Sequence, residues 1–136
     1  MANGTIAFDT LQTSGQIDGT ARSIDTDYLL NGSAKMWATI EMQNSNALRD
    51  SFNVGSTTDV SSGVTTFTFS NNMANTHYSP SGMSNDGYAF HLSASTSDGD
   101  TNSRATSSLK CKIRHNNGGE ADGTLQAQLH GELAWQ

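Results

Sequence analysis

The stretch LKCKIR, residues 109–114, carries the clearest structural signal in this chain of 136 residues. Its apolar residues Leu109, Cys111 and Ile113 alternate with three cations, and a period of two is typical of a β-strand with one buried face. The same alternation occurs in other short segments. We therefore predict further strands at 36–42, 65–69, 88–92 and 125–135.

Turn-forming residues separate these segments. The sequence VSSGV at 60–64 is typical of a hairpin turn, and NNGG at 116–119 predicts another turn. Pro80 and the NDG sequence at 85–87 indicate breaks in regular structure. No window shows a convincing helical period, so we expect an all-β fold. The prediction is an antiparallel β-sandwich, jelly-roll-like, over residues 34–136.

The first 33 residues differ from the rest. They hold two small apolar groups, one within 6–11 and one at Tyr28-Leu29-Leu30, which is surrounded by Asp, Asn and Gly. We interpret 1–33 as an extended arm that is ordered only by packing on another surface.

Composition limits the function. Hydrophobic residues make up 34% of the chain, whereas Ser, Thr, Asn and Gly account for 59 residues. This thin apolar content predicts that identical copies complete each other's burial. A net charge of −6 argues against a nucleic-acid partner. No stretch is long and apolar enough for membrane insertion, and the start MANGT has no secretory signal.

Chemical motifs are scarce. The sequence has no nucleophile elbow and no phosphate-binding loop, so we expect neither an enzyme nor a cofactor. The four histidines lie far apart, and we expect no metal site. The sequence DGDTN at 98–102 begins like a calcium loop, but Ser103 and Leu109 stand where glycine and glutamate are needed. We interpret it as a solvated turn. A metal ion bound on the symmetry axis of an oligomer is an alternative that the sequence leaves open. Cys111 is expected to be buried and inert.

The cations of the 109–114 stretch share the strand face opposite Cys111. We expect Lys110, Lys112 and Arg114 to form a solvated face, with contact to an acidic partner or a sulfated glycan as the alternative. In an oligomer they would pair with Glu41 or Glu132 of a neighbouring copy.

Four segments follow one another along the first part of the chain: TIAFDTLQTS at 5–14, MWATI at 36–40, LRDSFNV at 48–54, and GVTTFTF at 63–69 with Met73 and Tyr78 after it. In order and spacing they resemble small tail-fibre-like and head-fibre-like virion proteins of phages that infect cyanobacteria and other aquatic bacteria. That family has a proline after the methionine, where Ala74 stands here.

The resemblance implies a virion structural protein that is made in the host cytoplasm, forms a homotrimer and attaches to capsid or tail proteins through its N-terminal arm. It would be a short fibre or a decoration of the particle. Ile6, Phe8 and Leu11 would dock to the particle; alternatively they form a first strand that joins the sheet. The apolar strand faces would supply the trimer interface, with about half of these residues in an ordinary core: Met36, Ile40, Phe67, Phe69, Leu125, Leu129 and Trp135.

A second hypothesis is a receptor-binding tip that recognises a host-surface glycan. Exposed aromatic rings would stack on sugar faces, and Asp and Asn side chains from the 96–103 loop would bind hydroxyl groups. The candidates are Trp37, Tyr78, Tyr88, Asp98, Asp100 and Asn102.

Overall fold

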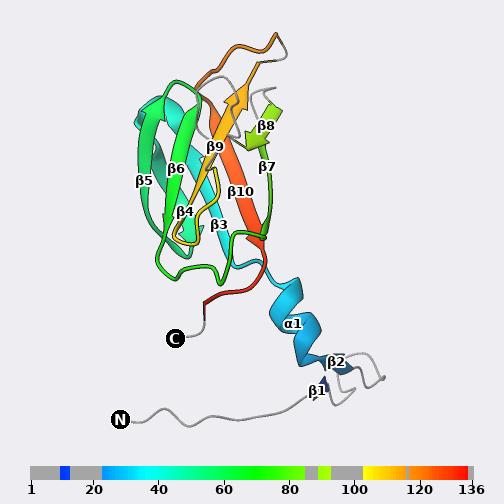
Figure 1. Cartoon of the computed structure of the whole chain (residues 1–136). Helices are drawn as coiled ribbons and strands as arrows, with labels where there is room; N and C mark the ends of the chain where they lie inside the picture. The colour runs from blue at the N-terminus through cyan, green and yellow to red at the C-terminus, as the bar shows by residue number, and fades with distance from the viewer. Residues whose placement is uncertain (1–9, 13–22, 85–88, 93–102, 116, 135–136) are drawn as a thin grey trace. The chain divides into compact units, whose positions relative to one another are not determined.

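The computed structural model describes residues 10–12, 23–84, 89–92, 103–115 and 117–134 (Figure 1). The chain divides into two units, Met1–Ser33 and Ala34–Gln136. In the N-terminal unit, β1 (Thr10–Gln12) pairs antiparallel with β2 (Ser23–Asp25), and α1 (Thr26–Gly32) follows directly.

Helix α1 corrects the prediction of an extended arm over this segment. Asp27 and Gly32 stand in the first and last turns of the helix. An acidic residue near the amino end and glycine at the carboxyl end both favour a helix. The N–H of Ser33 donates to the carbonyl of Leu29 at 3.3 Å and closes the last turn.

Within the described residues, no helix is long and apolar enough to cross a membrane.

Two four-stranded sheets form the second unit, which we call the β-domain, and every described strand pair in it is antiparallel. The first sheet has the order β4-β3-β10-β7, with the 3-10 turn η1 (Met42–Asn44) between β3 and β4. Its strands are β3 (Met36–Glu41), β4 (Ala47–Phe52), β7 (Ser79–Ser84) and β10 (Thr124–His130).

The second sheet has the order β5-β6-β9-β8 and lies in front of the first in Figure 1. Its strands are β5 (Val54–Ser61), β6 (Val64–Phe69), β8 (Ala89–Leu92) and β9 (Ser108–Arg114). The prediction of an all-β fold built from antiparallel sheets is confirmed.

One hydrophobic core fills the space between the sheets. Alternate side chains of the central strands β3, β6, β9 and β10 point into it, as the period of two requires. Val54 and Leu133 pack against its margin. The core consists of Met36, Ala38, Ile40, Met42, Phe67, Phe69, Met73, Tyr78, Leu109, Cys111, Ile113, Leu125, Ala127 and Leu129.

Two positions with left-handed backbone set the connections. Asn53, with φ 58°, stands between β4 and β5, where the chain passes from the first sheet to the second. Gly63, with φ 70°, lies in the β5–β6 hairpin that the sequence predicts. Its N–H donates to the Asp122 carboxylate at 2.6 Å, so the hairpin is held against the segment before β10.

Candidate functional site

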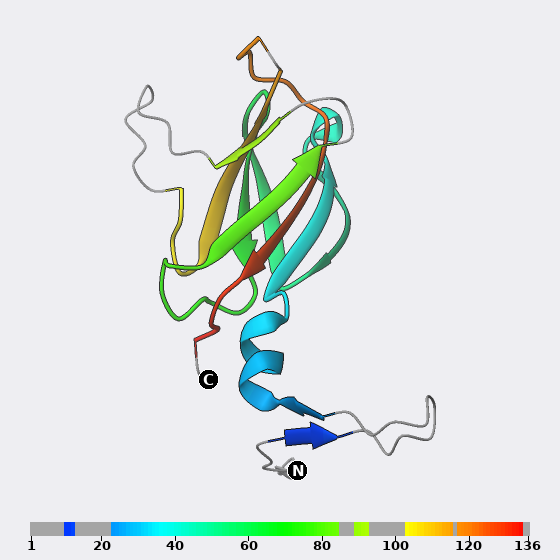
Figure 2. The same ribbon diagram turned by 90° about the vertical axis from the view of Figure 1, so that its right-hand side faces the viewer.

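A groove lies on the outward face of the sheet β4-β3-β10-β7, over the three strands β3, β10 and β7, which run side by side (Figure 2). Outward side chains cross these strands in two rows that follow from the strand register. The first row consists of Trp37, Gln128 and Ser81, and the second of Thr39, Gln126 and Met83.

The two largest side chains stand at diagonally opposite corners of these rows. Trp37 is 39% exposed and Met83 is 62% exposed, although both are apolar. Between the two rows stand small residues, Ala38 on β3, Ala127 on β10 and Gly82 on β7. On the outer strand β4, Phe52 faces Trp37 across the sheet and is 51% exposed, but it does not line the groove.

The groove has a volume of about 530 Å³, which is in the range of ligand pockets, roughly 300–1,000 Å³. All nine lining residues are uncharged: Trp37, Ala38, Thr39, Ser81, Gly82, Met83, Gln126, Ala127 and Gln128. The amides and hydroxyls both donate and accept hydrogen bonds. Because no lining side chain is an acid or a base, the arrangement suits binding and offers no group for proton transfer.

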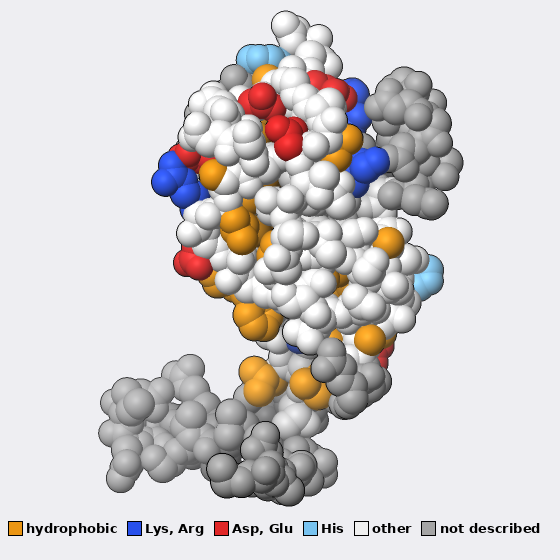
Figure 3. All heavy atoms as spheres, turned by 90° about the vertical axis from the view of Figure 1, so that its left-hand side faces the viewer, with side chains coloured by type: hydrophobic (Ala, Val, Ile, Leu, Met, Phe, Trp, Pro, Cys, Tyr) orange, Lys and Arg blue, Asp and Glu red, His pale blue; other side chains and the backbone are white. Residues whose placement is uncertain are grey.

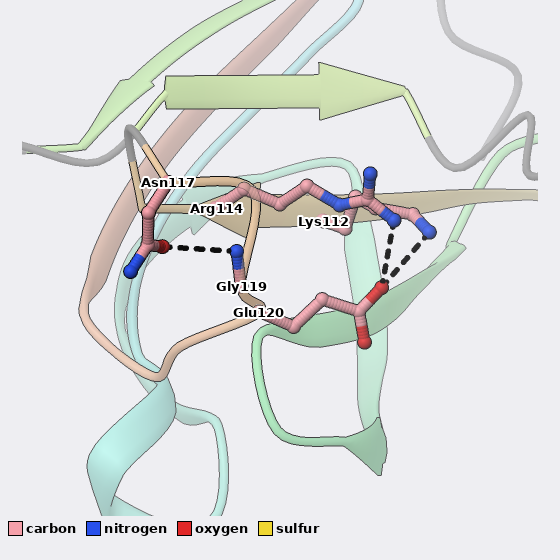
Figure 4. A network of polar contacts seen from close by, with 5 residues as sticks. All are labelled: Lys112, Arg114, Asn117, Gly119 and Glu120. Atoms are coloured by element: carbon pink, nitrogen blue, oxygen red, sulfur yellow. Dashed lines mark hydrogen bonds and ion pairs between the residues drawn. The ribbon is translucent and has the colours of Figure 1, made fainter.

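A cluster of charges lies on the opposite sheet (Figure 4). Lys112 Nζ lies 3.0 Å from Glu120 Oε1, and Arg114 lies 3.2 Å from the same oxygen. The Lys112 side chain is only 3% exposed, which corrects the prediction of a solvated basic face. The turn before Glu120 brings its carboxylate back onto β9, and there Gly119 N–H donates to Asn117 Oδ1 at 3.1 Å.

The hydrogen bond from Lys112 is the main reason why the pKa of Glu120 is lowered, and the bond from Arg114 adds to it. Glu41 lies elsewhere and pairs with Arg49, which lowers the Glu41 pKa. Lys112, Arg114 and Arg49 therefore have acidic partners within one copy.

Other reactive groups are buried or scattered. Cys111 lies in the core as predicted, and burial raises the pKa of its thiol, which keeps it protonated and unreactive. Among the described residues, no three His, Cys, Asp or Glu side chains come together as metal ligands.

Of the predicted glycan contacts, Trp37 lies at the groove and is exposed. The prediction for Tyr78 is wrong, because that ring is buried in the core and 2% exposed. Its single O–H lies between the carbonyl oxygens of Ala105 and Ser108, at 3.1 and 3.0 Å, which share its hydrogen bond. The remaining candidates lie outside the described residues: Tyr88, Asp98, Asp100 and Asn102.

The predicted interface residues are corrected in the same way. Six of them are buried within a single copy, because the two sheets present their apolar faces to each other, and no partner copy is needed to cover them. These six are Met36, Ile40, Phe67, Phe69, Leu125 and Leu129. Trp135 lies outside the described residues.

Leu11 is the described member of the predicted docking group, since Ile6 and Phe8 lie outside the described residues. It stands in β1 and pairs with Ile24 of β2. These two strands form a two-stranded sheet, so for Leu11 the alternative of joining a sheet of the β-domain is wrong.

The sequence prediction missed five of the six residues in the two rows. Gln126 and Gln128 take the outward positions of β10, but a glutamine on a strand face gives no signal of its own. Met83 and Ser81 were missed because β7 was not predicted as a strand. Only the register across β3, β10 and β7 brings them together.

No family model, no curated protein and no solved structure matches this chain.

Proposed function

We propose that the chain is a structural protein of a phage particle, either a short fibre or a decoration of the capsid or tail. The N-terminal unit attaches it to the particle, and the β-domain projects outward. A jelly-roll-like β-domain is part of this proposal. Its described residues form eight strands in two packed sheets, and a jelly roll has eight strands in two sheets. The protein would be made in the host cytoplasm and reside in the virion.

The observation that carries the proposal is the exposed apolar group on α1. Tyr28, Leu29 and Leu30 are neighbours in sequence, and all three are exposed. They belong to the N-terminal unit, which also contains Ile6, Phe8 and Leu11. Three adjacent exposed apolar side chains on one short helix favour attachment to another surface.

A homotrimer is part of the same proposal, with its contacts on outward-facing side chains. Leu48 of β4 and Val60 of β5 are exposed, and these strands end their sheets on the same side of the sandwich. Figure 3 shows that side, where hydrophobic atoms lie scattered among polar ones. A native mass measurement tests this point, and we expect about 43 kDa, three times the chain mass of 14.4 kDa.

Incorporation into particles tests attachment. The variant with Tyr28, Leu29 and Leu30 all changed to Ser should keep a folded β-domain, because these residues belong to the other unit, but it should no longer join particles. Met83→Ser is the matched control, because it removes an exposed apolar side chain of the β-domain that has no part in attachment or in the trimer contact, and it should still be incorporated. Normal incorporation of the triple variant, or loss of the β-domain fold after deletion of residues 2–20, would contradict the proposal.

A further inference from the structure

The groove on the first sheet combines exposed apolar walls with neutral hydrogen-bonding groups. Trp37 and Met83 remain exposed at its corners, while Gln126 and Gln128 stand between them on β10. Exposed apolar surface of this kind in a concave site is typical of ligand contact.

The chemistry of the lining selects the ligand class. The chain carries 20 charged residues, yet none of the nine residues that line the groove is charged. A charged ligand would lose water there without gaining a counter-charge. A neutral ligand rich in hydroxyl groups avoids that loss, because each amide both donates and accepts hydrogen bonds.

The geometry suits a flat ring with an apolar face and polar edges. The negative face of the Trp37 indole attracts the C–H groups on one face of a pyranose ring. From β3 to β7 the groove spans two strand spacings, about 10 Å. The amides of Gln126 and Gln128 lie across that span, within reach of the hydroxyl edge of a ring stacked on Trp37.

We propose that this groove binds a neutral saccharide, with Trp37 as the stacking platform and Gln126 and Gln128 as hydroxyl-binding residues. The site lies entirely within the β-domain and does not depend on attachment to a particle, so either proposal can fail without the other.

The test titrates the full chain with maltohexaose, cellohexaose, mannohexaose and fully N-acetylated chitohexaose as neutral probes, and with heparin as a charged probe. Amide and indole NMR signals report the binding surface. We expect at least one neutral probe, but not heparin, to shift the Trp37 indole signal together with the side-chain amide signals of Gln126 and Gln128.

Matched variants locate the site. Trp37→Ala should raise the dissociation constant about tenfold or more, which corresponds to roughly 1.4 kcal/mol. Phe52→Ala removes another exposed aromatic ring, one that does not line the groove, and should change the dissociation constant less than about twofold. The double variant Gln126→Ala, Gln128→Ala changes two exposed residues of β10 and should likewise raise the dissociation constant.

Three results would overturn the proposal. The first is that no neutral probe shifts these signals at millimolar concentration. The second is that Trp37→Ala and the glutamine double variant bind like the unaltered chain. The third is that the same signals shift with protein concentration alone and the sedimenting mass rises with them, because the groove is then a contact between copies.

Discussion

The side-chain amide of Asn53 donates a hydrogen bond of 2.9 Å to the carbonyl oxygen of Lys35, 18 residues earlier in the chain. The same amide donates to the carbonyl of Asn71 at 3.0 Å, and its oxygen accepts from the Asn71 N–H at 2.6 Å. One buried side chain thus joins the entry to β3, the β4–β5 corner and the segment after β6.

Replacement of Asn53 should therefore destabilise the β-domain. Asn53→Ala removes three hydrogen bonds of about 1 kcal/mol each and places alanine at φ 58°, where asparagine is better tolerated. We expect a loss of about 2–4 kcal/mol in the free energy of unfolding, measured in urea. Asn53→Gly keeps the backbone freedom and should lose less. Equal losses in both variants would show that the left-handed backbone contributes nothing.

The buried cation Lys112 predicts a specific role for Glu120. Glu120→Gln leaves the Lys112 ammonium without a counter-charge and should lower the free energy of unfolding at pH 7 by about 1–3 kcal/mol. Glu132→Gln, at an exposed glutamate, should change it by less than about 0.5 kcal/mol. A Glu120→Gln variant as stable as the Glu132 control would argue against the ion pair.

The pH dependence of that difference has a definite sign. The Glu120 pKa is lowered in the folded chain from 4.5, so the folded state favours the carboxylate. Its contribution is present above pH 4.5 and is lost as the pH falls through the folded pKa. The gap between the unaltered chain and Glu120→Gln should close over this acid range in urea titrations. A constant gap would contradict the assignment.

The β5–β6 hairpin tolerates no side chain at Gly63. A Cβ there would lie 2.6 Å from the Ala121 nitrogen, at a φ of 70°. Gly63→Ala should cost at least about 2 kcal/mol, because backbone strain and overlap act together. Gly118 also has a left-handed φ, 87°, but nothing lies within 4 Å of its Cβ position. Gly118→Ala thus measures the strain alone, and thermal unfolding should rank it as the milder change.

The phenol of Tyr78 should titrate late. Burial raises the pKa of Tyr78 from 10.0 to about 12, because the folded state favours the neutral form. The contribution of the neutral phenol to the free energy of unfolding is fully present below pH 10 and is lost as the pH rises towards 12. Absorbance of tyrosinate should show this late step in the unaltered chain, and Tyr78→Phe should lack it. Identical titrations of the two proteins would place Tyr78 outside the core.

Alternation along the sequence predicted the central strands best. Four strands have a neighbour on both sides in the described sheets, namely β3, β6, β9 and β10. Each has one buried face and one outward face, and a period of two in the sequence indicates that arrangement. β4 and β5 end their sheets and expose most of their side chains, so they show little apolar alternation. Pro80 suggested a break, yet proline is tolerated in a strand at the end of a sheet, where β7 lies.

The groove illustrates a different limit of sequence reasoning. Alternation placed Trp37 outward, opposite Met36 and Ala38, and this was correct. Its partners are about 45 and 90 residues away, on β7 and β10, and composition does not encode which strands become neighbours. Tyr78 shows the converse error, because an aromatic residue in a polar loop was interpreted as exposed, whereas its ring fills the core.

The pairing of β3 with β10 has a consequence for biosynthesis. A ribosome releases β3 early, but the strand that fills the middle of its sheet emerges about 90 residues later. Until residue 130 has left the exit tunnel, Met36 and Ile40 have no β10 side chains to cover them. A chain that lacks β10 therefore exposes apolar side chains and an unpaired strand edge, the surfaces that favour aggregation and chaperone binding.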